Sequence, residues 1–382
     1  MRFKPAFLLW VIFHLSLCAV WAQTDAGATK PASQTVLDPS SMDASVDPCL
    51  DFYTYACGGW MKKNPIPPDQ ASWTSYSKLE DENLIELRQI LENASAAAAG
   101  RDAVTQKIGD YYASCMDEKA IEAEGAKPLK PGLDEIEKLG SKAEIADVAG
   151  RMPDDGILFN FSSDQDFKDS SQEIAEADQG GLGLPDRDFY FKEDAKSAEI
   201  RKAYVAHVQK MLELAGEKPE AAASDAQTIM RIETELARGS MTRVERRDPA
   251  KLYHKVSSTE LEQMSPSFRW GTYFTKVGLA ALKSLNVVAP DFFKTMNAVL
   301  QKESLANWKA YLRWKLVHAD AQYLSSPFVN ENFNFYGKIL QGKEQLRPRW
   351  KRCTDYVDSD LGEALGQAYV AKYFSPEAKA QA

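Results

Sequence analysis

Apolar residues recur at steps of three and four along most of the chain, which is the spacing of one face of an α-helix. The predicted helices cover residues 76–91, 104–115, 133–139, 204–212, 229–236 and 292–324. Only the apolar stretch 157–161, bounded by Asp154-Asp155-Gly156, has the length and flanks of a strand. The pattern predicts a mainly α fold, a multi-helix lobe with few short strands.

Glycine and proline mark the expected breaks between these helices. Residues 127–132 and the glycine-rich stretch 180–190 are predicted to be loops. Gly58-Gly59 is expected to stop any helix there, and the prolines that follow should prevent another from starting before Asp69.

The N-terminus has the pattern of a secretory signal peptide. Arg2 and Lys4 precede an apolar run from Ala6 to Val20, and Val20-Trp21-Ala22 offers a cleavage site. The run is short for a membrane span, which needs about 20 apolar residues. We therefore expect residues 1–22 to be removed, residues 23–45 to form a disordered linker, and the protein to be secreted, periplasmic or extracellular. Lipid attachment at Cys18 is a weaker alternative, because Leu17 is large where a small residue is expected.

Charge and cysteine content limit the functions and the disulfide pairings that the chain can have. The 382 residues carry a net charge of -9, which argues against a general nucleic-acid-binding surface. Without Cys18, four cysteines remain, Cys49, Cys57, Cys115 and Cys353, and their pairing has three possible connectivities. Cys115 shares a helical face with Val104 and Ile108, so it should point inward.

One aromatic, cysteine-bracketed segment, Asp47–Trp60, stands out, and Asn64-Pro-Ile-Pro67 follows it shortly afterwards. It resembles the N-terminal signature of the neprilysin and endothelin-converting-enzyme family of zinc metallopeptidases. Three more stretches resemble blocks of that family in the same order: Gly180–Tyr190, Arg247–Tyr253 and Arg347–Phe374.

The resemblance implies a domain at residues 46–374, followed by a truncated end at 375–382. It implies a disulfide between Cys115 and Cys353, and it implies that Cys49 and Cys57 reach into a C-terminal catalytic lobe that this sequence does not contain. Within 46–70, the residues expected to dock on that lobe are Cys49, Cys57, Phe52, Tyr53 and Trp60.

The residues for zinc chemistry are missing from the sequence. Such a peptidase holds zinc with two histidines at i and i+4 on one helix, beside a glutamate that activates the bound water. His14 lies in the signal peptide, and His207, His254 and His318 have no such spacing. We therefore expect no catalytic residue, metal ligand or cofactor in this chain, although the complete family enzyme uses zinc.

Two weaker candidates are also set aside. Some relatives hold a substrate carboxylate with two arginines just after the signature, but Ser72 and Glu80 occupy the matching positions, and Lys78 is the only cation nearby. The stretch 337–344 nearly spells a phosphate-binding loop, but Glu344 stands where Ser or Thr must hold magnesium.

These observations predict the N-terminal, non-catalytic lobe of a secreted neprilysin-like zinc metalloendopeptidase. By the resemblance, this lobe roofs a closed cavity that admits small peptides, and its partner is the catalytic lobe. The alternative is a stand-alone secreted scaffold that binds peptides or proteins and descends from such a peptidase.

Overall fold

A computed structural model describes residues 38–96, 100–152 and 156–381. The chain divides into two compact units, Met1–Pro65 and Ile66–Ala382. The predicted signal peptide and residues 23–37 of the predicted linker lie outside the described residues. Within the described ranges, no helix has the length and apolar character needed to cross a membrane.

The first unit is built on α1 (Phe52–Lys63), preceded by a short 3₁₀ turn, η1 (Pro39–Ser41). Asp51 begins α1, because its carboxylate accepts a hydrogen bond from the N–H of Thr54 at 2.9 Å. The expectation that Gly58-Gly59 stops a helix was wrong, since α1 runs through both glycines.

Close packing explains the two glycines. A Cβ atom on Gly59 would lie 2.5 Å from the carbonyl oxygen of Met42 and 2.6 Å from that of Ser40. The backbone that precedes α1 therefore lies directly against the helix, where only glycine fits. An ion pair between Lys62 and Asp43, at 2.6 Å, holds the same two segments together.

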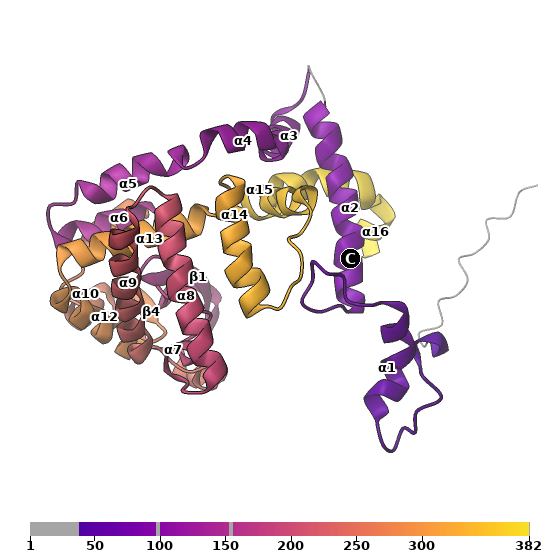
Figure 1. The fold of residues 1–382 in the computed structure, drawn as a ribbon, viewed down its shortest axis with the longest axis horizontal. Helices are drawn as coiled ribbons and strands as arrows, with labels where there is room; N and C mark the ends of the chain where they lie inside the picture. The colour runs from indigo at the N-terminus through magenta and orange to yellow at the C-terminus, as the bar shows by residue number, and fades with distance from the viewer. Residues whose placement is uncertain (1–37, 97–99, 153–155, 382) are drawn as a thin grey trace, which may run out of the picture. The chain divides into compact units, whose positions relative to one another are not determined.

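The second unit is mainly α-helical, as the sequence pattern predicts (Figure 1). Its α-helices are α2 (Ser75–Ala96), α3 (Ala103–Met116), α4 (Glu118–Glu124), α5 (Lys130–Glu137), α6 (Ile145–Arg151), α7 (Asp188–Phe191), α8 (Ala195–Leu214), α9 (Pro219–Gly239), α10 (Ser258–Met264), α11 (Trp270–Lys276), α12 (Pro290–Lys302), α13 (Leu305–Asp320), α14 (Ser326–Asn332), α15 (Arg349–Tyr373) and α16 (Pro376–Gln381). A π-helix, η7 (Phe333–Leu340), continues from α14.

Three segments differ from the sequence-based expectation. The predicted loop over 180–190 is partly wrong, since α7 begins at Asp188. The predicted helix over 292–324 is two helices, because Glu303 is extended and Ser304 caps α13 by accepting from the N–H of Asn307. The predicted loop over 127–132 is also partly wrong, since α5 begins at Lys130 with Pro131 in its first turn. Proline is well tolerated there, because the first helical N–H groups have no intrahelical acceptor.

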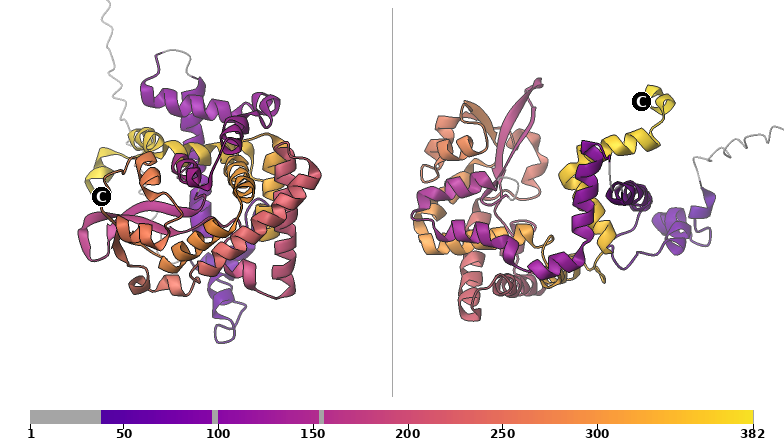
Figure 2. Two further views of the ribbon diagram at one scale, coloured as in Figure 1. Left: turned by 90° about the vertical axis from the view of Figure 1, so that its left-hand side faces the viewer. Right: turned by 90° about the horizontal axis from the view of Figure 1, so that it is seen from above.

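A four-stranded sheet lies beside the helices, in the order β1-β2-β4-β3. The strands are β1 (Phe159–Asp166), β2 (Asp169–Gln179), β3 (Lys255–Ser257) and β4 (Ser284–Val287). β1 and β2 form an antiparallel hairpin, which Figure 2 shows as a long ribbon standing out from the helices, and β2 pairs in parallel with β4. The sequence-based strand at 157–161 overlaps only the start of β1. The rest of the hairpin is too polar to be recognised as strand from a run of apolar residues.

The second unit contains two hydrophobic cores. In the larger, α9 packs against α8, α12 and α13. Its biggest fully buried side chains include Trp308, Trp314, Tyr204, Tyr311, Phe292 and Phe293. The smaller core joins α2, α3 and α15 through Leu91, Ile108, Tyr112, Cys353, Val357 and Leu365. Burial of each large apolar side chain contributes roughly 1.5–3 kcal/mol, so both cores are substantial.

Candidate functional site

The residues expected to dock on a catalytic lobe all lie in the first unit. Phe52 and Tyr53 are 68% and 67% exposed, and Trp60 is half-buried. Cys49 is exposed and Cys57 partly buried, and neither forms a disulfide. Aromatic side chains and two thiols at this degree of exposure are unusual on a monomer surface, where they tend to mark an interaction site.

The other two cysteines are bonded to each other. Cys115 on α3 and Cys353 on α15 form a disulfide with their Cα atoms 5.8 Å apart, across a sequence separation of 238 residues. This is the pair that the family resemblance implies. The bond lies at the edge of the smaller core, where α3 and α15 pack against each other.

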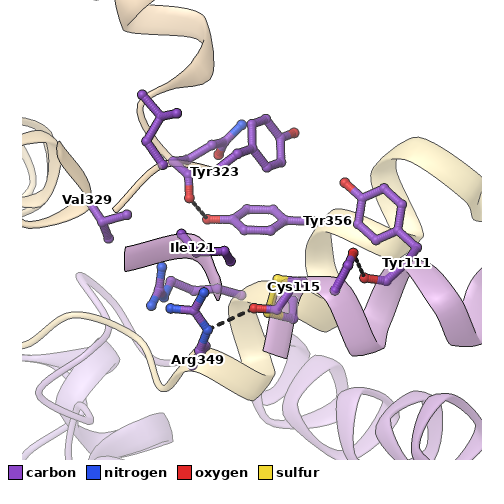
Figure 3. A pocket seen from close by; sticks show the side chains of 12 residues that line it. Tyr111, Cys115, Ile121, Tyr323, Val329, Arg349 and Tyr356 are labelled. Carbon is purple, nitrogen blue, oxygen red and sulfur yellow. Dashed lines mark hydrogen bonds between the residues drawn. A yellow bond between two sulfur atoms is a disulfide. The ribbon is translucent and has the colours of Figure 1, made fainter. Parts of the chain in front are cut away.

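A cavity of about 250 Å³ opens beside this disulfide (Figure 3). Its walls come from α3, α4, α14, α15 and the turn after α13. Tyr323 and Tyr356 meet edge to face there, with ring centroids 4.9 Å apart, and the hydroxyl of Tyr356 donates to the carbonyl of Gln322 at 3.3 Å. The aromatic wall is therefore fixed by packing and by a hydrogen bond.

Two arginines from the first turns of α15 line the same cavity. The Nε of Arg349 donates to the carbonyl oxygen of Cys115 at 2.8 Å, which ties α15 to the end of α3. The Nε of Arg352 donates to the carbonyl oxygen of Arg347 at 3.2 Å. Burial raises the pKa of Tyr356, and the charge of Arg352 partly offsets that rise. Tyr356 therefore stays protonated at neutral pH.

The three histidines of the described chain are far from forming a zinc site. His207 is buried, with its ring stacked on Phe335 and its Nδ1 2.9 Å from Oε1 of Glu331. The Nδ1 of His254 lies 3.1 Å from the carbonyl oxygen of Val287. His318 packs between Trp314 and Tyr336.

The other side chains that could act as metal ligands also form no zinc site in the described part of the chain. Among the described residues, no group of three or more His, Cys, Asp or Glu side chains could hold a metal ion. The residues present therefore do not fit the family's zinc, and no catalytic step can be assigned to them. That the chain binds no zinc in solution stays a prediction.

The glycine-rich stretch 180–190 is anchored on a buried carboxylate. Glu233 on α9 is fully buried and accepts hydrogen bonds from the hydroxyls of Tyr190, at 2.7 Å, and Tyr204, at 2.8 Å. The hydroxyl of Tyr190 in turn accepts from the N–H groups of Gly183 and Leu184. Burial raises the pKa of Glu233, while the nearby Lys315 and the tyrosine hydroxyls lower it. This network holds the loop rigidly against α8 and α9.

A second cavity, of about 510 Å³, lies along that loop. Its charged lining residues are Asp186, Arg243, Arg246 and Lys315. Arg243 pairs with Asp186 at 2.5 Å, Arg246 pairs with Asp178 at 2.7 Å, and Lys315 interacts with the charge of the buried Glu233. Each of the three cations therefore has a carboxylate nearby.

The positions that match the carboxylate-binding arginines of some relatives lie at or near the start of α2. Ser72, Lys78 and Glu80 are all exposed. A lysine beside a glutamate on an open helix face is typical of a solvated surface.

Sequence reasoning missed the cavity beside the disulfide. Its arginines and tyrosines come from segments more than two hundred residues apart, such as Tyr111 and Tyr356. In the sequence, the stretch 347–374 stands out as a family block and not as part of a cavity. Arg349 and Arg352 lie three residues apart on one helix face, and this spacing was the only available signal.

Comparison with known proteins gives consistent matches. A sequence profile described as "Peptidase family M13" matches residues 48–382. Endothelin-converting enzyme 1 of Mus musculus is 30% identical over 360 residues, which is 89% of this chain and 45% of the mouse protein. An endothelin-converting enzyme homolog of Locusta migratoria is 28% identical over 365 residues, covering 89% of this chain and 49% of that protein.

A solved structure has the same fold. The zinc metalloprotease Zmp1 of Mycobacterium tuberculosis, in complex with an inhibitor, superposes with a TM-score of 0.83 at 32% identity. The match covers 90% of this chain and 53% of that one. The chain thus spans about half the length of the relatives it matches.

Proposed function

Since the chain belongs to peptidase family M13, we propose that it forms the helical, non-catalytic lobe of a zinc metalloendopeptidase. In this proposal the lobe closes one side of a chamber in which small peptides are cut, and a region outside this chain supplies the zinc. The observation that carries the proposal is the family match over residues 48–382 in a sequence that has no H-E-x-x-H motif.

The rigidity of the second unit supports a wall role. A chamber that selects peptides by size needs rigid walls. Here α9 lies between α8, α12 and α13, and the buried Glu233 fixes the glycine-rich loop. Fully satisfied buried polar networks of this kind make a packed core more rigid.

The first unit supports a docking role. Its exposed aromatic residues and its two free thiols, Cys49 and Cys57, would become buried and bonded on a catalytic lobe. The pattern of residues 1–22 favours export, and export would permit those bonds to form.

The test is to purify the chain and to measure zinc by elemental analysis and peptide hydrolysis with and without a chelator. We expect background zinc and no chelator-sensitive hydrolysis, because a catalytic zinc needs three protein ligands and one open position. One equivalent of tightly held zinc, with activity lost in the variants His207→Ala, His254→Ala or His318→Ala, would disprove the proposal.

A stand-alone binding scaffold is the second candidate. The cavity beside the disulfide favours it, because that cavity could hold a ligand without any catalytic lobe. Reading the DNA downstream of the Ala382 codon separates the two: an H-E-x-x-H reading frame supports the peptidase lobe, and unrelated sequence supports the scaffold.

A further inference from the structure

A third cavity, of about 330 Å³, lies next to the cavity beside the disulfide, near the start of α15. The two share the lining residues Gln322, Val329 and Tyr356, and together we call them the α15 groove. Each part is at or below the lower end of the roughly 300–1,000 Å³ typical of ligand pockets. A ligand of the groove must therefore be small.

The charge of the groove is opposite to that of the whole protein. Although the chain has a net charge of -9, the described residues that line the groove include four cations and no carboxylate. The cations are Lys343, Arg347, Arg349 and Arg352. A concave surface lined by one sign of charge concentrates ligands of the opposite sign.

The ion pairs outside the groove neutralise only part of this charge. Arg347 pairs with Asp355 at 2.5 Å, whereas Arg349 is 3.9 Å from the exposed Glu118. In the described part of the chain, no carboxylate lies within 4.0 Å of the Arg352 guanidinium. Lys343 also has no carboxylate within that distance among the described residues, but it lines the other cavity of the groove. In the cavity beside the disulfide, Arg352 is therefore the cation best placed to receive an anionic ligand.

Two residues that line the 330 Å³ cavity also carry polar atoms without a hydrogen-bond partner among the described residues. The Nε of Arg347 and the Oδ1 of Asn332 are buried, and neither makes a hydrogen bond within the described residues. Buried polar atoms are nearly always paired, by protein, water or ligand. Because both atoms are shielded from solvent, they lie beneath the cavity surface, where a ligand in the cavity does not contact them.

The other walls are apolar. Ile121, Leu324 and Val329 face the tyrosine pair Tyr323 and Tyr356, as Figure 3 shows for the labelled members. A flat or branched apolar side chain would contact these walls while an attached anion reached Arg352. The groove thus combines an apolar wall and a cationic wall within one small volume.

We propose that the α15 groove binds a carboxylate joined to an apolar side chain, as in the C-terminal residue of a peptide or an N-acylated free amino acid. The carboxylate lies on Arg352, with Arg349 nearby, and the side chain lies against Tyr323 and Tyr356. This binding belongs to the chain alone and needs neither zinc nor a catalytic lobe, so its test is independent of the proposed function.

The experiment uses isothermal titration calorimetry on the purified, oxidised chain with N-acetyl-phenylalanine and with its amide. The acid should bind at least about tenfold more tightly than the amide, because a charge-assisted hydrogen bond to arginine is worth about 1.5–3 kcal/mol. Arg352→Gln should weaken binding of the acid about fivefold or more. Arg269→Gln is the matched control, since Arg269 is an exposed arginine on the wall of a different cavity, and it should leave the affinity unchanged.

A second variant, which fills the groove, tests whether misfolding could explain a loss of binding. Ser114 is exposed on α3 at the edge of the groove, so Ser114→Trp should fill the opening and abolish binding without lowering the thermal midpoint. A tetrapeptide ending in phenylalanine distinguishes the two kinds of ligand. If the tetrapeptide also binds, the groove accepts the C-terminus of a peptide. If only N-acetyl-phenylalanine binds, the groove accepts free N-acylated amino acids. Either result supports the proposal. Equal affinity for acid and amide, unchanged binding by Arg352→Gln, or no binding at millimolar ligand would overturn it.

Discussion

His318 shows how burial, helped by nearby positive charge, keeps a histidine ring neutral. Its pKa is lowered from an ordinary 6.5 to about 3, chiefly because burial disfavours the charged ring, with smaller contributions from Lys315 and His207. Its Nδ1 atom is buried without a hydrogen-bond partner in the described part of the chain. His318 therefore packs as a neutral aromatic ring at neutral pH.

This lowered pKa predicts a loss of stability in mild acid. Between pH 6.5 and about 3 the unfolded chain binds a proton that the folded chain does not, so the unfolding free energy falls as the pH falls. The loss should reach about 2 kcal/mol at about pH 5, since each pH unit costs about 1.4 kcal/mol. Urea unfolding at about pH 7 and about pH 5 measures it.

The matched variants are His318→Phe, which should remove most of the loss, and His254→Gln, which should keep it because His254 is exposed. If His318→Phe loses as much stability as the wild type, the histidine is not responsible.

Gly183 predicts a second effect at the scale of one residue. A Cβ atom there would lie 1.9 Å from the hydroxyl oxygen of Tyr204, which is held by Glu233. Gly183→Ala should therefore destabilise the protein by about 1–3 kcal/mol, because the network must shift to make room. Chemical denaturation gives the value.

Gly366 is the control for this substitution. It lies inside α15, and an added Cβ would meet no atom within 4 Å. Gly366→Ala should stabilise the protein by up to about 1 kcal/mol through helix propensity. Equal effects of the two substitutions would mean that packing against Tyr204 is not what excludes a side chain at position 183.

At the scale of elements, the disulfide predicts the largest single loss of stability. In the chain-entropy model, a bond that spans 238 residues stabilises the fold by about 5 kcal/mol. Peptide mapping without reductant should recover the Cys115–Cys353 pair, and the Cys115→Ala/Cys353→Ala double variant should unfold at much lower denaturant. Recovery of Cys115 linked to Cys49 or Cys57 would contradict this assignment.

The sequence predicted elements well where one physical effect dominates and poorly where two compete. Long helices such as α2, α3 and α9 follow from apolar periodicity, because one stripe of each is buried. β2 could not be found in this way, since only Ile174 and Ala177 of its residues are fully buried. Its other residues are held by backbone pairing with the neighbouring strand β1, and Glu176 and Ala177 also pair with the distant strand β4.

Glycine caused the clearest wrong prediction. Local propensity predicts that Gly58-Gly59 stops a helix. Instead α1 continues through both glycines, because the preceding backbone packs against the helix at Gly59. A glycine that costs a helix about 1 kcal/mol can still be required when another backbone approaches within contact distance. Local sequence does not show that approach.

At the scale of the whole molecule, the state of the four cysteines follows from their positions. Iodoacetamide should label both Cys49 and Cys57 in the folded, oxidised chain, because neither is bonded and both keep some exposure. Cys115 and Cys353 should react only after reduction. A bond between Cys49 and Cys57, or complete protection of both in a monomer, would contradict the docking role of the first unit.

The candidate site was only partly predictable at this scale. The cysteines and aromatics of residues 46–70 could be found because they form one contiguous block. The α15 groove could not, since Ile121, Tyr323 and Arg352 become neighbours only when α4, the turn after α13 and α15 assemble. Its cations are also hidden in a sequence whose overall charge is negative.

The Cys115–Cys353 bond also changes how the protein can be cut. It closes residues 115–353 into a covalent ring that contains the whole larger core. A protease that nicks any one loop of this ring opens it without releasing a fragment, and both ends stay anchored in packed helices. A chain built in this way can tolerate a single cleavage in a protease-rich environment and lose no mass until a reductant is present.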